Sequence, residues 1–220
     1  MTYPIFLQLE DKIALVVGGG RVAQRKVETL LKCGAVIHII SRVLTDKLKE
    51  LIDSNKVRLL GEEMRDEFLD DVFIVIAATD DKELNSRVSE IARNRGLLVN
   101  AVDQPADCNF IVPSIVRKGD LTIAISTSGK SPALAKKIRK EIDGQFGNEY
   151  ESFLNLMGTL RKEILEMGLS QEENSRIFHK IVDGGIIEAI ARNDLAKVES
   201  SLGSILPQEI NIKDVLSELK

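Results

Sequence analysis

Short runs of β-branched and other apolar residues recur through the first hundred residues of the chain. The first run, IALVV within residues 12–17, is typical of a strand that is buried on both faces of a parallel sheet. Similar runs predict further strands at 36–40, 57–60, 72–77 and 97–102. The pattern therefore predicts a sheet that is covered on both sides.

Longer stretches between these runs place apolar residues at helical spacing. The stretch after the first run has its apolar residues on one face and ends at Gly34. Further helices are predicted at 45–54 and 82–95, the second of which ends at Gly96. Strands that alternate with helices of this length predict an α/β fold, a Rossmann-like doubly wound parallel sheet whose ligands bind beyond the carboxyl ends of the strands.

The pattern changes after Asp103. The segments FIVPSIV (110–116) and LTIAIS (121–126), separated by the polar residues 117–120, predict a hairpin. From Ser131 onward the chain is predicted to be helical, with Ser131 as N-cap and Pro132 as first helical residue. We expect three parts: a dinucleotide-binding domain at 1–113, a small α+β segment at 114–146 and a helical domain at 147–220.

Composition and charge narrow the class of protein. The 220 residues are 44% hydrophobic and 29% charged, as in an ordinary globular protein. The formal net charge is −4, whereas general nucleic-acid binders usually have a basic surface. No segment approaches the roughly 18 apolar residues of a membrane span, and the N-terminus lacks signal-peptide features, so we expect no membrane association and a cytoplasmic location. Cys33 and Cys108 lack CxxC spacing, which predicts two buried free thiols and no metal site.

The stretch VVGGGRVA carries the candidate phosphate-binding turn. Gly18, Gly20 and Ala23 form a G-x-G-x-x-A arrangement directly between a predicted strand and helix. Gly18 permits a tight turn, Gly20 lets the backbone approach a diphosphate, and Ala23 lets the helix pack close to the sheet. The alternative is a glycine-rich turn that binds no ligand.

The carboxylate that usually accepts hydrogen bonds from the adenosine ribose is missing after the second predicted strand. Ser41, Arg42 and Val43 occupy its place. On physical grounds Arg42 suits the 2′-phosphate of NADP, so the residues alone leave the choice between NAD and NADP open.

Several separated blocks resemble one family. The segments YPIFLQLEDKIALVVGGGRVAQRK and LLVNAVDQPADCNFIVPSIVRKGDLTIAISTSGKSP are similar to the precorrin-2 dehydrogenase part of siroheme synthases. The resemblance covers about the first two thirds of the chain. It implies NAD-dependent oxidation of precorrin-2 to sirohydrochlorin by a homodimer whose middle segment forms much of the subunit contact. The cofactor-binding residues expected from the turn and the resemblance together are Gly18, Gly20, Arg21, Val22, Ala23, Ser41, Arg42, Val43, Thr79 and Asp80.

Asp103 is the candidate catalytic residue. It ends the strand LLVNAV, at the sheet edge where ligands bind, and it matches the catalytic aspartate of the family. Oxidation of the macrocycle removes a hydride and a proton, and the proton needs a base within hydrogen-bond reach. The alternative is a turn-forming aspartate before Gln104-Pro105.

The hydroxyl-rich loop before the helix at Pro132 is the candidate substrate site. Precorrin-2 is a polycarboxylate. Hydroxyl groups, a lysine and a helix N-terminus can bind its carboxylates by hydrogen bonds and by charge. The expected substrate-binding residues are Ser126, Thr127, Ser128, Lys130 and Ser131. An N-capped helix with a solvated cationic face is an equally good interpretation.

Three other functions stay open at this level. A bifunctional enzyme would also insert Fe²⁺ as a sirohydrochlorin ferrochelatase, although His38 and His179 form no evident metal pair. A non-catalytic dinucleotide-sensing module would use the same turn but would not need Asp103 beside the cofactor. A reductase for another small acid is disfavoured by the block from Asn100 to Pro132.

Overall fold

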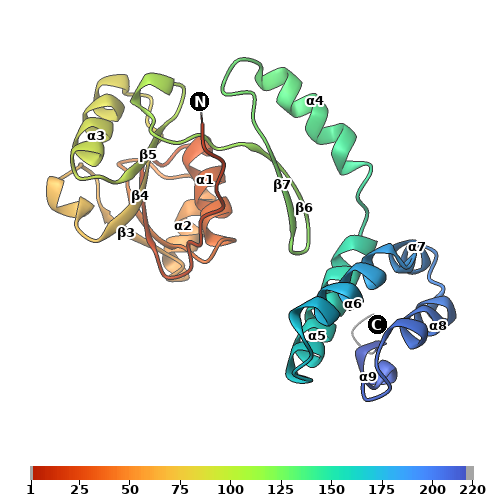
Figure 1. Cartoon of the computed structure of the whole chain (residues 1–220). Helices are drawn as coiled ribbons and strands as arrows, with labels where there is room; N and C mark the ends of the chain where they lie inside the picture. Colours follow the sequence, from red (N-terminus) through yellow and green to blue (C-terminus); the bar gives the residue numbers. More distant parts are fainter. Residues whose placement is uncertain (1, 217–220) are drawn as a thin grey trace. The chain divides into compact units, whose positions relative to one another are not determined.

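The computed structural model describes residues 2–216, apart from the side chain of Lys213. The chain divides into two compact units, Met1–Val112 and Pro113–Lys220 (Figure 1). Each unit has a hydrophobic core of its own. The first contains the predicted strand–helix alternation and the second contains a hairpin and helices.

A parallel sheet forms the centre of the first unit. Its described strands are β1 (Ile13–Val17), β2 (Val36–Ile40), β3 (Val57–Gly61), β4 (Val72–Ala77) and β5 (Leu98–Ala101). They pair in the order β3-β2-β1-β4-β5, and every pair is parallel. The order reverses at β1, so the loops after β1 and β4 diverge there and leave room for a ligand. The predicted doubly wound sheet is confirmed.

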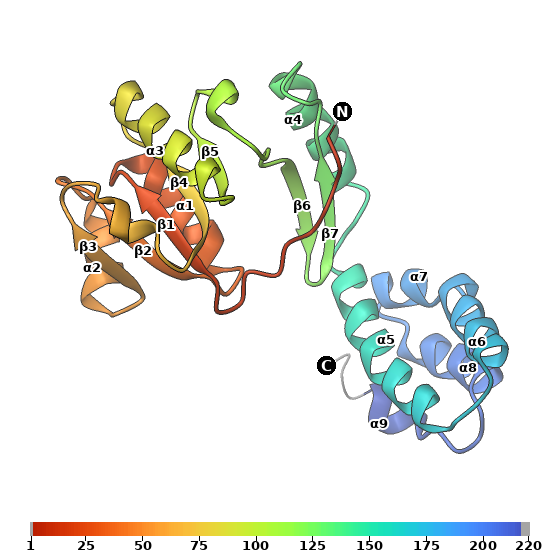
Figure 2. The ribbon, with the colours of Figure 1, turned by 60° about the vertical axis from the view of Figure 1, so that its left-hand side comes forward.

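Helices cover both faces of this sheet (Figures 1 and 2). They are α1 (Arg21–Leu31), α2 (Asp46–Asp53) and α3 (Lys82–Asn94), with short 3₁₀ turns η1 (Asp66–Leu69) and η2 (Pro105–Asp107). Val16 and Ile39 pack with α1 and α2 on one face, whereas Leu15 and Val75 pack with α3 on the other. Successive residues of a strand point to opposite faces of the sheet. A strand in which every residue is apolar therefore contributes to the hydrophobic core on each face.

The second unit begins with an antiparallel hairpin. Strands β6 (Ser114–Lys118) and β7 (Leu121–Ile125) pair in register and pack against α4 (Pro132–Asp143). The sequence predicted the first strand within 110–116, but it starts only at Ser114. Pro113 precedes it and lacks an N–H for pairing. Arg117 and Lys118, expected in the turn, belong to β6, and the turn is Gly119-Asp120.

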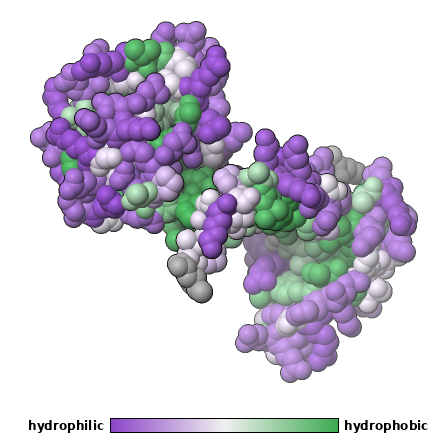
Figure 3. All heavy atoms as spheres, turned by 90° about the horizontal axis from the view of Figure 1, so that it is seen from above, coloured by the Kyte–Doolittle hydropathy of each residue, from purple (hydrophilic) through white to green (hydrophobic). Residues whose placement is uncertain are grey.

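A helical cluster completes the second unit. Its elements are α5 (Glu149–Glu166), α6 (Gln171–Asp183), α7 (Ile186–Ala191), α8 (Leu195–Ile205) and α9 (Ile212–Leu216). Leu156, Leu160 and Ile181 are among the fully buried residues of its core. Hydrophobic areas interrupt the mostly hydrophilic surface in Figure 3. Within the described residues, no helix is long and apolar enough to cross a bilayer.

Candidate functional site

A cleft of about 990 Å³ lies at the carboxyl ends of the parallel strands. The loops that follow β1, β2, β3, β4 and β5 all contribute to its lining. Of the predicted cofactor residues, the structure brings nine to this cleft: Gly18, Gly20, Arg21, Val22, Ser41, Arg42, Val43, Thr79 and Asp80. The tenth, Ala23, belongs to the first turn of α1 and is fully buried.

The backbone of the glycine turn is held against neighbouring strands. The Gly18 N–H donates to the Ile40 carbonyl at 2.8 Å, and the Ala78 N–H donates to the Val17 carbonyl at 2.8 Å. Gly18 has a φ of +117°, and a Cβ there would lie 2.3 Å from the Ala78 carbonyl oxygen. Only glycine therefore fits this position without a backbone shift.

The N-terminus of α1 faces a space that suits a diphosphate. Gly20 is the N-cap, and no side chain caps the helix. A Cβ on Gly20 would meet no described atom within 4 Å. Uncapped N–H groups and the helix dipole favour an anion at this point. The turn thus fits a dinucleotide, with open room at Gly20 and tight packing at Gly18 and Ala23.

The end of β2 forms one wall of the cleft. The Ser41 hydroxyl donates to the Val43 carbonyl at 2.7 Å and stabilises the turn that follows the strand. The Arg42 guanidinium forms an ion pair with Glu63, which lies in the loop after β3. Glu63 also lines the cleft. A carboxylate is therefore present beside the end of β2, although it follows β3 and not β2, where dinucleotide-binding sheets usually carry it.

A polar network joins the loops after β4 and β5 on the opposite wall. Asn85 of α3 is 1% exposed. Its Oδ1 accepts hydrogen bonds from the Thr79 N–H and hydroxyl, and its Nδ2 donates to the Thr79 carbonyl and to Gln104 Oε1. Gln104 Nε2 in turn donates to the Ser86 hydroxyl and to Asp107. The network fixes the loops after β4 and β5, on one wall of the cleft, relative to α3.

Replacing Asn85 by alanine is expected to loosen both loops. The change removes the partner of the half-buried Thr79 N–H and carbonyl, which costs on the order of 1–3 kcal/mol, whereas the Thr79 hydroxyl keeps its contacts with Asp81. Hydrogen exchange of peptides that span Thr79 and Gln104 should become at least about tenfold faster. Asn94→Ala, at the exposed end of the same helix, is the matched control and should leave exchange unchanged. Equal exchange in both variants would show that Asn85 does not hold the loops.

Asp103 stands at the rim of the cleft, directly after β5. It lines the same cleft as Gly18 and Gly20 and is exposed. Its φ of +59° lies in the left-handed region, which aspartate and asparagine tolerate better than most residues. The Val102 N–H just before it donates to the Ala77 carbonyl at 2.9 Å, which ties the start of the loop to β4. The predicted base and the predicted cofactor residues therefore share one cleft.

The loop predicted to bind substrate belongs to the second unit. Its hydroxyls support the loop itself: Ser126 Oγ accepts from the Ser128 N–H, Thr127 Oγ1 from the Ser131 N–H, and Ser131 Oγ from the Leu134 N–H. The N-cap role of Ser131 is confirmed. Ser128 and Lys130 are exposed. Binding of substrate by this loop remains a prediction.

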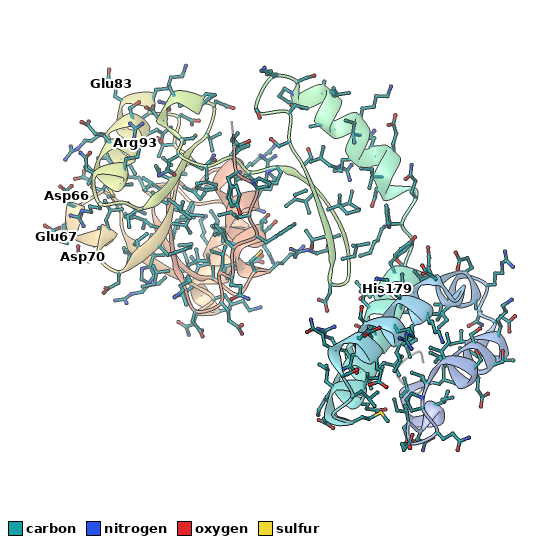
Figure 4. The ribbon with its side chains drawn as sticks, viewed as in Figure 1. Asp66, Glu67, Asp70, Glu83, Arg93 and His179 are labelled. Carbon is teal, nitrogen blue, oxygen red and sulfur yellow. The ribbon has the colours of Figure 1, made fainter. Side chains whose placement is uncertain are left out.

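No histidine or cysteine is among the described residues that line this cleft. His38 is half-buried in β2, where burial and then the charge of neighbouring Arg58 lower its pKa. His179 lies on α6, and its Nδ1–H donates to the Ser175 carbonyl (Figure 4). Both cysteines are free, and both are half-buried where full burial was expected. Among the described residues, no group of three potential ligands is arranged to hold a metal ion.

Sequence reasoning missed three residues that shape the cleft. Glu63, Asn85 and Gln104 line it or hold its loops, and none lies in the glycine motif. Glu63 follows β3 by two residues, so the general rule that ligands bind beyond strand ends was the available signal. No sequence pattern indicated that Asn85 is buried, because its burial depends on Gln104, a hydrogen-bond partner 19 residues away.

Two family profiles match the chain. The profile described as "Putative NAD(P)-binding" matches residues 5–114, and the profile described as sirohaem biosynthesis protein, central, matches residues 118–145. The siroheme synthase of Sodalis glossinidius is 36% identical over 203 residues, which cover 92% of this chain. Siroheme synthase 1 of Serratia proteamaculans is 36% identical over 205 residues. The chain spans 43% of the length of each of these relatives.

A solved structure extends the similarity over nearly the whole fold. The protein titled "SirC, precorrin-2 dehydrogenase" aligns with a TM-score of 0.77 and 27% sequence identity. The alignment covers 93% of this chain and 98% of that one. The agreement therefore includes both the sheet and the helical C-terminal part.

Proposed function

Because the chain belongs to the NAD(P)-binding family that the first of these profiles defines, we propose that it oxidises precorrin-2 to sirohydrochlorin with NAD as hydride acceptor. This is a step of siroheme or related tetrapyrrole biosynthesis. The observation that carries the proposal is the single cleft shared by the glycine turn and Asp103. Similarity to a precorrin-2 dehydrogenase over 93% of the chain supports the choice of substrate.

The first unit holds the dinucleotide in this proposal. The N–H groups at the start of α1 bind the diphosphate, with Gly20 leaving room for it. Ser41, Arg42 and Val43 border the adenosine half, and Thr79 and Asp80 border the nicotinamide half. When bound, NAD supplies the acceptor for the hydride.

Asp103 accepts the proton that leaves with the hydride. Removal of a hydride and a proton from precorrin-2 gives sirohydrochlorin, NADH and one proton, so the reaction balances without a further oxidant. The Asp103 carboxylate follows β5 and lines the cleft that holds the dinucleotide in this proposal, which supports its role as the base. The Asn85–Gln104 network positions the loop that carries it.

Substrate carboxylates bind to the loop that begins α4. Lys130 and the helix N-terminus attract anionic groups, and the exposed Ser128 hydroxyl is available to donate to them. This assignment rests on residue chemistry and on the match of residues 118–145 to the central part of sirohaem biosynthesis proteins.

Assembly and location belong to the same proposal. Residues 114–146 mediate a homodimer, and the helices at 147–220 form a further domain. Ile115 on β6 and Leu134 on α4 are 37% and 47% exposed, which leaves apolar surface for a second copy of the chain to cover. The cytoplasm is the proposed location.

Anaerobic spectrophotometry of the purified chain with precorrin-2 tests the activity. Conversion to sirohydrochlorin with NAD, and slower conversion with NADP, is the expected result. Dinucleotide binding without conversion would instead favour a non-catalytic sensing module.

A further inference from the structure

The ion pair between Arg42 and Glu63 links the loops after β2 and β3. These strands are parallel neighbours (Figure 2). Ile40 lies opposite Gly61, and the Ser41 N–H donates to the Gly61 carbonyl at 3.1 Å. The loops therefore leave the sheet side by side. The Arg42 guanidinium meets the Glu63 carboxylate where both residues line the cleft.

In dinucleotide-binding sheets, the residue after β2 contacts the adenosine ribose and decides whether a ribose with a 2′-hydroxyl or with a 2′-phosphate is bound. A carboxylate there binds the ribose hydroxyls of NAD, whereas an arginine accommodates the 2′-phosphate of NADP. The sequence of this chain offers only Arg42. In the structure, Glu63 Oε1 accepts a hydrogen bond from Nη2 of that arginine, and Glu62 next to it also lines the cleft.

Local charge then disfavours a phosphate at this end. One arginine and two glutamates leave a formal charge of −1 beside the end of β2. Among the described residues, the other cations of the cleft are Arg21, Lys82 and Arg87. They belong to α1 and α3 and not to the loops after β2 and β3.

We propose that Glu63 is the specificity-determining residue of the cleft, because it supplies from the loop after β3 the carboxylate that the end of β2 lacks. Glu63 neutralises Arg42 and repels a 2′-phosphate, so the cleft selects NAD over NADP. The inference rests on the proposed binding of a dinucleotide here, and it names the residue responsible for the choice.

The exposure of the pair makes it suitable for a test. The side chains of Arg42 and Glu63 are 69% and 71% exposed, and exposed ion pairs contribute little to folding. Glu63→Gln removes the charge and keeps the size of the side chain. Any change in dinucleotide preference then reports on recognition and not on unfolding.

Isothermal titration calorimetry with NAD, NADP and the fragments 5′-AMP and 2′,5′-ADP is the test. The unmodified chain should prefer the ligands without a 2′-phosphate. In Glu63→Gln the affinity ratio should shift toward NADP and 2′,5′-ADP by about tenfold or more, because Arg42 is released. Adding Arg42→Gln should reverse the shift.

Glu67→Gln is the matched control. Glu67 lies on η1 beside Asp66, and Asp70 follows directly after η1 (Figure 4). Glu67 is outside the cleft lining, and its substitution removes the same charge. The affinity ratio should not change in this variant. If Glu63→Gln still bound NAD and its NAD-to-NADP affinity ratio were unchanged, the inference would be overturned, but the proposed function would stand. Failure of the unmodified chain to bind any of the four ligands would overturn the proposed function and the inference with it.

Discussion

Asp103→Asn is expected to lower turnover of precorrin-2 by about 100-fold or more, the usual contribution of a positioned general base. Asparagine keeps the size of the side chain and tolerates the left-handed backbone at this position, where φ is +59°. It cannot accept the proton that leaves the macrocycle. Affinity for NAD should stay within about threefold, because the glycine turn is untouched.

Single-turnover kinetics and calorimetric titration of NAD measure the two quantities separately. Asp11→Asn is the matched control. Asp11 is also exposed with a φ of +59°, but it precedes β1 and so lies at the amino ends of the strands, away from the cleft. Its turnover should equal that of the unmodified chain. Normal turnover in Asp103→Asn would remove this aspartate from the mechanism and leave it as a turn residue.

The second large effect is expected at Gly20. A methyl group on Gly20 meets no described atom within 4 Å, and its φ of −78° suits alanine, so Gly20→Ala should fold with unchanged thermal stability. The same methyl group would stand where the diphosphate approaches the helix. Affinity for NAD should therefore fall about tenfold or more.

Gly18→Ala should behave differently, because its Cβ would lie 2.3 Å from the Ala78 carbonyl and its φ is +117°. This substitution should destabilise the fold by on the order of 1–3 kcal/mol. Thermal unfolding and fluorescence titration with NADH distinguish the two variants. If Gly20→Ala bound NADH as tightly as the unmodified chain, the diphosphate would not bind at this helix N-terminus.

The framework of the cleft was predictable from hydrophobic patterning. β2 and β4 have the predicted bounds, because short apolar runs between amphipathic stretches leave few other solutions. The N-cap at Ser131 was predictable for a similarly local reason, since Ser-Pro before an apolar stripe specifies a helix start. Local rules succeed where the determining groups are close in sequence.

The walls of the cleft were less predictable. Glu63 reaches Arg42 only because β2 and β3 pair with a particular register, and that register is a property of the folded sheet. The burial of Asn85 likewise depends on Gln104 in a distant loop. Cys108 was expected to be a buried thiol, yet it is half-buried, and its Sγ contacts the backbone of Ala101 and Gln104 beside the loop that carries Asp103.

The stoichiometry of the anaerobic reaction tests the central claim most directly. Precorrin-2 consumption and NADH formation are followed in the same cuvette, with the unmodified chain and with NAD as the added oxidant. The account predicts one NADH for each sirohydrochlorin formed. Sirohydrochlorin that forms without NADH, or NAD that binds and is never reduced, would contradict it.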